Sequence, residues 1–326
     1  MLHVMDPKNA LLIALAALTV VFTAVWVVSL LREKAKDSVA GDNPNTSGTP
    51  YMASQIGVGF FANFLDTLGV GSFATTSSIY KLLHAVPDDL IPGTMNVGHA
   101  LPTVVEAFIF VAVIAVDFKL LASMIVAAAL GAWFGAGIVS GWPKRRIQIG
   151  LGLALLGAAA LMLSSQLRLI PLGGDALSLS GAKFWIAVGA NFMFAAFQQL
   201  GVGLYAPCMI LISLLGMNPK AAFPIMMGSC AFLMPVGSFR FIRTKRYGAK
   251  AAIGLTIGGI PAVLLAAYLV KSLPLGVVRW LVVFVVCYTA IMLLRSAAVE
   301  KAAAGDDAAK NADAAESAPA ARPAVE

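Results

Sequence analysis

The chain has 326 residues, of which 60% are hydrophobic and 12% charged, and its mean hydropathy is +0.87. This composition excludes an ordinary soluble globular domain. The net charge of +7 does not indicate a nucleic-acid partner, because the basic residues gather in short loops between apolar segments, as at the ends of membrane helices. We therefore expect a protein whose main partner is the lipid bilayer.

The first apolar stretch, residues 9–31, is long enough to cross the hydrocarbon layer and is followed by Arg32, Lys34 and Lys36. It is longer than a signal-peptide core and has no convincing small-residue cleavage site. We interpret residues 1–32 as an additional N-terminal transmembrane helix; a cleaved signal peptide is the alternative. Residues 33–53 read as a polar cytoplasmic linker.

An internal repeat begins after the linker. Leu-Gly-Val-Gly at residues 68–71 recurs 132 residues later at residues 200–203, and Pro87 and Pro92 recur as Pro219 and Pro224. A repeat of this period in an apolar chain is typical of a duplicated transporter. The sequence predicts a first repeat at 54–167, an inter-repeat loop at 168–182 and a second repeat at 183–296.

Each repeat opens with a glycine-interrupted segment, at 54–85 and 183–216. These segments are too long for one spanning helix and too short for two, so we expect helical hairpins bent at Gly69–Gly71 and Gly201–Gly203. Three transmembrane helices then follow in each repeat, at 92–116, 120–141 and 147–166 in the first and at 220–239, 249–270 and 276–295 in the second.

Basic residues predict how the repeats are oriented. The loop 240–250 carries five Lys or Arg residues, whereas its counterpart at 117–119 carries one, so equivalent loops should face opposite sides of the membrane. The predicted fold is an all-α polytopic protein of two inverted repeats plus the N-terminal helix, in the inner (plasma) membrane. Residues 297–326, rich in Ala, Asp, Glu and Pro, are expected to form a disordered cytoplasmic tail.

The hairpin tips are the best pointer to a binding site, because irregular backbone at membrane depth is tolerated only where it is buried in protein or lines a watery cavity. Glycines that merely pack helices, and hydroxyls that bond to their own backbone, are the alternative readings. The predicted substrate-binding residues are Asp66, Gly69, Gly71, Ser72, Thr75, Thr76, Asn96, Gln198, Gln199, Gly201 and Gly203.

Ionisable side chains inside membrane segments are costly and are functional candidates by default. Asp66 and Glu106 are the two acids in such segments, and His99 lies on the helical face that also carries Asn96 and Thr103. Asp66, His99 and Glu106 are therefore candidates for proton coupling. A helix-capping role for the acids and a structural role for the histidine remain open.

No feature of the sequence indicates an enzyme. HExxH and GxSxG motifs are lacking, and Cys208, Cys230 and Cys287 sit in apolar segments without metal-ligand spacing. We expect no cofactor and no resident metal.

The second half resembles a repeat of the TauE/SafE permeases. The resemblance rests on the turn Gly201, Gly203 and Pro207, on LLGMNPKAAFPIMMGS, on the basic loop RFIRTKRYG, and on IGGIPAVLLAAYLVKSLP before a last apolar helix. It extends over about 54–296 and implies inverted repeats, small sulfur-containing anions as substrates, and no enzymatic cofactor.

The leading functional hypothesis is a secondary transporter that exports a small anion, such as sulfite, an organosulfonate or a related sulfur compound, by alternating access around the two tips, with protons as a further partner. One alternative is a cation or metal-ion transporter with Asp66, Glu106 and His99 as ligands. A membrane-embedded enzyme is less favoured. The sequence leaves the oligomeric state open.

Overall fold

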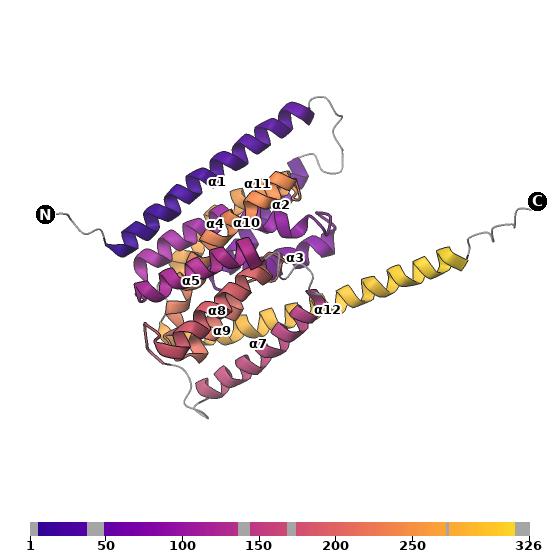
Figure 1. Ribbon diagram of the computed structural model, residues 1–326. Helices are drawn as coiled ribbons and strands as arrows, with labels where there is room; N and C mark the ends of the chain where they lie inside the picture. The colour runs from indigo at the N-terminus through magenta and orange to yellow at the C-terminus, as the bar shows by residue number, and fades with distance from the viewer. Residues whose placement is uncertain (1–5, 38–48, 136–143, 168–173, 272–273, 317–326) are drawn as a thin grey trace, which may run out of the picture.

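A computed structural model describes residues 6–37, 49–135, 144–167, 174–271 and 274–316. Within these residues the protein is helical, and its helices form a bundle with the long α12 projecting from it (Figure 1). The helices are α1 (Pro7–Asp37), α2 (Thr49–Thr67), α3 (Ser72–Leu83), α4 (Ile91–Val113), α5 (Phe118–Leu130), the π-helix η2 (Gly131–Gly135), α7 (Lys144–Gln166), α8 (Gly181–Gln198), α9 (Tyr205–Leu214), the 3₁₀-helix η3 (Pro219–Ala221), α10 (Ala222–Thr244), α11 (Ala249–Lys271) and α12 (Leu275–Glu316).

Five stretches within the described residues are long and apolar enough to cross a membrane. They are 7–32 in α1, 91–113 in α4, 219–244 in η3 and α10, 249–269 in α11 and 276–299 in α12. The protein is therefore a multi-pass membrane protein. The shorter apolar segments 118–134 and 205–214 belong to the same bundle.

Both glycine-interrupted segments are two helices separated by a short irregular tip, as the sequence predicts. The first tip separates α2 from α3 at residues 68–71, and the second separates α8 from α9 at residues 199–204. Apart from the end of α12, the spanning helices after each tip also begin and end within about five residues of their predicted limits, although 136–141 lies outside the described residues.

Two boundaries differ from the predicted ones. Helix α1 continues to Asp37, so the start of the predicted linker is helical, whereas residues 38–48 lie outside the described part of the chain. Helix α12 runs on to Glu316 instead of giving way to a disordered tail at residue 297. The Ala, Glu and Lys residues beyond this point have high helix propensity, which explains why the helix continues.

The two halves pack crosswise. Helix α2 of the first half lies along α11 of the second, and α8 of the second half lies along α5 and η2 of the first, while α4 pairs with α10 and α7 with α12 (Figure 1). Small residues permit the close approach: a Cβ on Gly258 would overlap the carbonyl oxygen of Ile56, and one on Gly131 would overlap that of Phe192. The helices of the two halves are therefore interleaved.

A proline within α4 leaves one backbone carbonyl without its helical hydrogen-bond donor, and a side chain of a neighbouring helix donates to it instead. Pro102 has no N–H, so the carbonyl of Gly98 lacks its usual helical donor. The hydroxyl of Thr256 on α11 donates to this carbonyl at 2.7 Å. In a membrane, where water is not at hand, such a replacement bond satisfies the exposed carbonyl and fixes α11 against α4.

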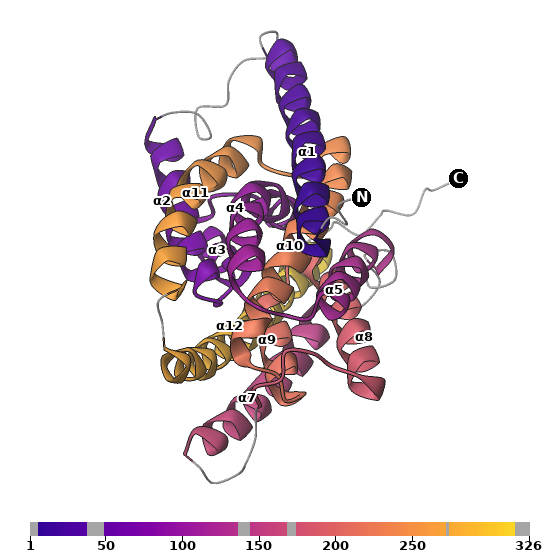
Figure 2. The ribbon, with the colours of Figure 1, turned by 90° about the vertical axis from the view of Figure 1, so that its left-hand side faces the viewer.

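Helix α1 lies along the outside of the bundle (Figure 2). Its buried Phe22 stacks on Trp26 and meets the ring of Phe239 on α10 edge to face, with centroids 5.8 Å and 6.3 Å apart. Most of its other apolar side chains are exposed, Val20 by 69% and Leu31 by 62%. Such exposure suits contact with lipid.

Candidate functional site

The two hairpin tips end their first helices in the same way. At the first tip, Gly69 N–H donates to Asp66 C=O at 2.7 Å, and Val70 N–H donates to Leu65 C=O at 3.0 Å. The second tip repeats both bonds 132 residues later, at 2.9 Å and 3.2 Å. This pair of bonds is a Schellman motif, whose left-handed residue favours glycine. Gly69 and Gly201 occupy that place, with φ of +94° and +85°.

In each hairpin, a side chain at the end of the first helix accepts a hydrogen bond from the backbone N–H six residues later, at the start of the second helix. Asp66 accepts a hydrogen bond from Ser72 N–H, and Gln198 Oε1 accepts one from Leu204 N–H at 3.3 Å. Each bond satisfies an N–H that has no partner within its helix. Asp66 thus makes the helix-capping contact that the sequence left open as an alternative.

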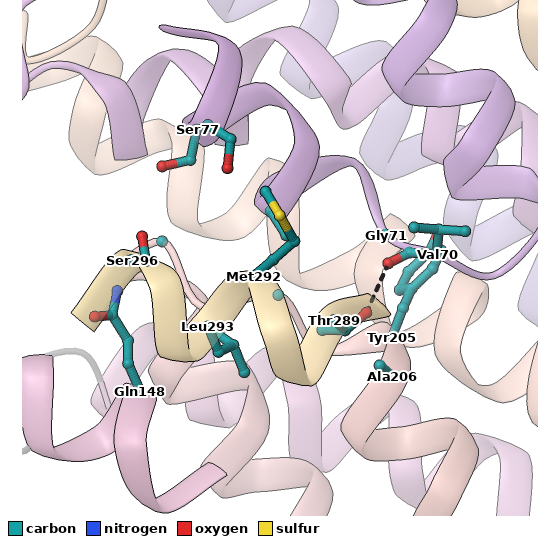
Figure 3. A pocket seen from close by; sticks show the side chains of 14 residues that line it. Val70, Gly71, Ser77, Gln148, Tyr205, Ala206, Thr289, Met292, Leu293 and Ser296 are labelled. Atoms are coloured by element: carbon teal, nitrogen blue, oxygen red, sulfur yellow. Dashed lines mark hydrogen bonds between the residues drawn. The ribbon is translucent and has the colours of Figure 1, made fainter. Parts of the chain in front are cut away.

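A first cavity lies between the tips and helices α7 and α12, and we call it the hydroxyl cavity. Both tips line it, together with hydroxyl groups and one amide, and its volume of about 20 Å³ is room for about one water molecule. Figure 3 shows Ser77, Gln148 and Ser296 toward one end and Gly71 and Tyr205 toward the other. Its polar lining residues are Ser77, Ser78, Gln148, Tyr205, Thr289 and Ser296.

A second cavity, the carboxyl cavity, lies on the other side of the same tips and has a volume of about 10 Å³. Its polar lining comprises Asp66, Ser72, Thr103, Gln198 and Tyr205. The Thr103 hydroxyl and Gln198 Nε2 are buried and have no hydrogen-bond partner. Gly71, Gly203 and Tyr205 line both cavities and so form the wall between them.

His99 lies outside both cavities in a network of neutral groups. Asn63 donates through Nδ2 to Gly59 C=O at 2.7 Å, which turns its Oδ1 toward His99 Nδ1 at 3.1 Å. Nδ1 must then carry a hydrogen, and Nε2 can accept from the Thr76 hydroxyl at 3.0 Å. Both ring nitrogens therefore have partners when the imidazole is neutral.

Glu106 connects the two halves. Its Oε1 lies 2.7 Å from the hydroxyl of Thr67 at the end of α2, and its Oε2 accepts from the Tyr205 hydroxyl at 2.7 Å. The carboxyl is fully buried, and Tyr205 is 3% exposed. One carboxyl group of α4 thus contacts both hairpins.

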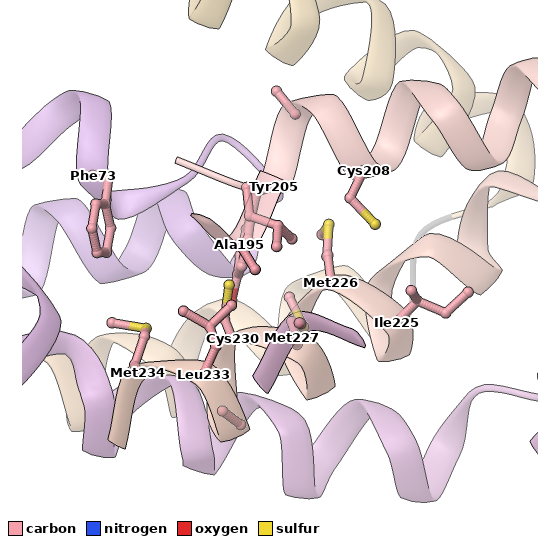
Figure 4. Packing of buried hydrophobic residues seen from close by; sticks show 14 of the residues in the cluster. Phe73, Ala195, Tyr205, Cys208, Ile225, Met226, Met227, Cys230, Leu233 and Met234 are labelled. Atoms are coloured by element: carbon pink, nitrogen blue, oxygen red, sulfur yellow. The ribbon is translucent and has the colours of Figure 1, made fainter. Parts of the chain in front are cut away.

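The second half replaces most of this polar network with apolar residues. At the repeat spacing of 132, Asn63, Thr76 and His99 correspond to Ala195, Cys208 and Ala231. Figure 4 shows Ala195 and Cys208 among Met226, Met227 and Ile225 of α10, in the apolar core. The chemistry of the two halves therefore differs even where their backbones agree.

The structure divides the predicted site residues into two groups. Asp66, Gly71, Ser72, Gln198, Gly201 and Gly203 line one or both cavities. The other predicted contacts are engaged elsewhere: Gly69 in its turn, Thr76 with His99, Asn96 through a bond to Pro92 C=O, and Gln199 against Gly237. Thr75 is buried, and its hydroxyl has no hydrogen-bond partner.

Seven polar side chains that line the two cavities were not among the predicted residues: Ser77, Ser78, Thr103, Gln148, Tyr205, Thr289 and Ser296. Tyr205 could have been found as the repeat counterpart of Phe73, because a hydroxyl on one member of a matched pair is a difference in chemistry. Thr103 belongs to the polar stripe of α4 that was already visible in the sequence. Gln148, whose buried Oε1 has no hydrogen-bond partner, gives no signal beyond being an amide in an apolar helix.

A metal site does not form among the described residues. Within these ranges no three His, Cys, Asp or Glu side chains gather as a ligand group. Tyr205 interacts with both Asp66 and Glu106, whereas His99 has Thr76 and Asn63 as its partners.

The comparisons with curated proteins and with solved structures found no match. The family model of the sulfite exporter TauE/SafE matches residues 1–163. This match begins before α1, a helix that the sequence analysis did not include in the resemblance, and it ends within α7. The match therefore covers the first half of the chain, whereas the motifs that carried the resemblance lie in the second half. Because the match spans half of a multi-pass helical chain, the chain belongs to the TauE/SafE family, a family of transporters and not of enzymes.

Proposed function

We propose that this protein is a secondary transporter that exports a small sulfur-containing anion, such as sulfite or an organosulfonate, by alternating access around the two hairpin tips. The observation that carries the proposal is the shared wall between the cavities. Gly71, Gly203 and Tyr205 come from tips far apart in the chain, and together they separate the hydroxyl cavity from the carboxyl cavity. Movement of either tip would join the two.

Neutral donors at the tips suit an oxyanion. The Thr103 hydroxyl and Gln198 Nε2 are buried without partners beside the carboxyl cavity, and leaving such groups unpaired costs about 1–3 kcal/mol each. A sulfite or sulfonate oxygen would satisfy them. Both cavities hold about one water, so this conformation corresponds to a closed site that must widen to admit the anion.

A larger cavity near the first residues of α12 forms the other end of the proposed transport route, away from the hydroxyl cavity. This Lys220 cavity has a volume of about 320 Å³ and is lined by Lys220, Asn218 and apolar side chains that include Val278. Val278 and Ser296 of the hydroxyl cavity are about 27 Å apart along α12 at 1.5 Å per residue. That separation approaches the thickness of the hydrocarbon layer.

The stacked rings of Phe110 and Phe223 line the Lys220 cavity, with centroids 5.5 Å apart. Both rings are buried, and one helical turn from Phe110 along α4 lies Glu106. We propose that this pair closes the Lys220 cavity from the tips, as Tyr205 closes the hydroxyl cavity. Closure at both ends is what alternating access requires of an intermediate between its two open states.

Inverted repeats, a cytoplasmic C-terminus and a plasma-membrane location belong to the same proposal. Matched tips and crosswise packing support a two-fold relation between the halves, and the uneven distribution of Lys and Arg supports the inverted orientation. Proton coupling through Asp66, His99 or Glu106 completes the mechanism, since all three are buried in a membrane protein, where ionisable side chains are functional candidates by default.

The test is transport of labelled sulfite, sulfoacetate and taurine by the full chain in proteoliposomes, with efflux and uptake measured separately. Saturable movement that Asp66→Asn reduces would support the proposed site. Absence of movement for every sulfur anion would refute the substrate class.

A paired cysteine experiment tests the route. Ser72→Cys and Leu204→Cys occupy the same repeat position in the two tips and would be made in a background without the three native cysteines. During turnover, a membrane-impermeant thiol reagent should reach each engineered cysteine, and substrate should protect it. Complete inaccessibility in both variants while the protein transports would refute a route through the tips.

A further inference from the structure

We propose that Glu106 is the side chain that carries the coupled proton, and that Thr67 and Tyr205 link its protonation to the two hairpin tips. This inference rests on the proposed function and selects one residue from its three candidates. The structural basis is the chain of contacts from Tyr205 through Glu106 and Thr67 to the backbone of α2.

A count of hydrogens favours a protonated Glu106 in this conformation. Three contacts must be satisfied: Tyr205 to Glu106 at 2.7 Å, Glu106 to Thr67 at 2.7 Å, and Thr67 to Asn63 C=O at 2.9 Å. The two hydroxyl groups supply one hydrogen each. The Thr67 hydroxyl is within donating distance of both Glu106 Oε1 and Asn63 C=O but has a single hydrogen. When that hydrogen goes to Asn63, the contact with Glu106 takes a hydrogen from the carboxyl, so a protonated Glu106 satisfies all three contacts and an ionised one satisfies two.

Asp66 and His99 have partners of another kind. Asp66 accepts a backbone N–H at the start of α3, a bond that serves the turn. His99 is satisfied as a neutral ring between Asn63 and Thr76. Asp66 belongs to the first hairpin and also interacts with Tyr205 of the second, whereas Glu106 lies on α4, outside both hairpins, and contacts Thr67 of one and Tyr205 of the other.

Within the part of the chain that the structure describes, no positively charged side chain interacts with Glu106. The titratable groups that face it are Asp66 from α2, Tyr205 from α9 and Cys230 from α10, and on its own helix His99 lies two turns away. A carboxylate at this depth beside Asp66 would be both desolvated and repelled. The neutral acid is therefore the form that fits this closed arrangement.

Loss of the proton would change contacts at both tips. An ionised Glu106 would accept from Tyr205 and Thr67 together, so the Thr67 hydroxyl would leave Asn63 C=O, and the new charge would repel Asp66 beside Thr67. Tyr205 lines both cavities, which gives water in either one a path to the Glu106–Tyr205 bond once a tip moves. The proton passes to that water and returns from water on the other side.

The repeat provides an internal control, because the positions that correspond to Tyr205 and Glu106 carry no tyrosine–glutamate pair. At the spacing of 132, Tyr205 corresponds to Phe73 and Glu106 to Ser238, whose buried hydroxyl has no hydrogen-bond partner. Phe73 has no hydroxyl to donate. One proton site, formed between the halves rather than within each, is the expected result.

The deciding variant is Glu106→Gln, because its amide can accept from Tyr205 and donate to Thr67 but cannot release a proton. Proteoliposomes would be loaded with labelled methanesulfonate, whose sulfonate stays ionised across the pH range used, with the membrane potential held at zero. A gradient of one pH unit supports about a tenfold accumulation per coupled proton. The wild-type protein should show this ratio, and Glu106→Gln should show a ratio of one.

Asp66→Asn and His99→Gln are the matched controls, and the accumulation ratio is meaningful whatever their absolute rates. Both should keep a ratio well above one. An accumulation ratio in Glu106→Gln equal to that of the wild type would overturn the assignment. So would an accumulation ratio of one in Asp66→Asn or His99→Gln together with a wild-type ratio in Glu106→Gln.

Infrared spectroscopy of the purified protein separates this inference from the proposed function. The wild-type spectrum should contain a protonated carboxylic-acid band, sensitive to deuterium exchange, that is absent in Glu106→Gln and present in Asp66→Asn. A band that disappears in Asp66→Asn and persists in Glu106→Gln would refute the inference even if no sulfonate moves. Absence of transport together with the expected band would refute only the proposed substrate.

Discussion

Alanine at Gly71 and alanine at Gly203 should have opposite effects on stability, although the two residues hold the same repeat position. Gly71 has φ +88° and ψ 126°, a conformation that side-chain-bearing residues rarely adopt, whereas Gly203 has a φ that is not positive. Space does not distinguish the sites, because a Cβ would lie 3.6 Å from Tyr205 at the first and 3.4 Å from Phe73 at the second.

The expected magnitudes follow from these dihedral angles. Either substitution reduces the conformational entropy of the unfolded chain, which stabilises the fold by about 0.4–1 kcal/mol where the backbone is compatible. At Gly71 the strained backbone costs about 1–3 kcal/mol. Gly203→Ala should therefore be neutral or slightly stabilising and Gly71→Ala destabilising, and the difference between the variants isolates the strain.

Unfolding by SDS in mixed micelles, followed through the fluorescence of the five tryptophans, measures both variants against the wild type. The prediction requires Gly71→Ala to unfold at a lower SDS fraction and Gly203→Ala to unfold at the wild-type fraction or above it. Equal midpoints for the two variants, or a more damaging Gly203→Ala, would refute the argument from backbone conformation.

Other substitutions test the packing that holds the tips. Gly258→Ala should destabilise the protein by about 1–3 kcal/mol through overlap with the backbone of α2, while Gly57→Ala on α2, which has open space, should stabilise it by up to about 1 kcal/mol; SDS unfolding midpoints that rank the other way would contradict this. Thr256→Val removes the donor to the carbonyl freed by proline and should cost about 0.6 kcal/mol, at most about 1.7, and faster hydrogen exchange in α4 should accompany it. Asn191→Leu removes bonds from α8 to both α5 and α10 and should cost about 1–3 kcal/mol; thermal unfolding in detergent that matches the wild type would show that these bonds contribute nothing.

Hydrophobic length and glycine spacing made the helices and the two tips predictable. The repeat placed the breaks at residues 68–71 and near 201, and both Schellman turns need glycine at the predicted position. The end of α12 was not predictable from hydropathy, because its continuation to Glu316 depends on helix propensity rather than burial.

The site was harder to predict because its partners are distant in sequence. Polarity and membrane depth indicated Glu106 and His99, but nothing local joins Glu106 to Tyr205, 99 residues away. His99 and Thr76 were both named as candidates, yet their contact with each other depends on how α3 crosses α4. Burial of a polar residue can be read from one helix, whereas its partner depends on the packing of several.

The replacement of Tyr205 by Phe73 at the matching position has a thermodynamic consequence for a transporter whose halves exchange conformations. In the exchange that inverted repeats would perform, an open state that keeps Tyr205 on Glu106 retains this hydrogen bond, whereas an open state that instead brings Phe73 to Ser238 has none at that contact. One such bond contributes about 0.5–1.5 kcal/mol, so the two end states would differ in population by a few-fold to about tenfold. An unloaded molecule would then rest mainly facing one side, and the two faces would differ in apparent affinity for the substrate, while the substrate and ion gradients alone set the direction of net flux.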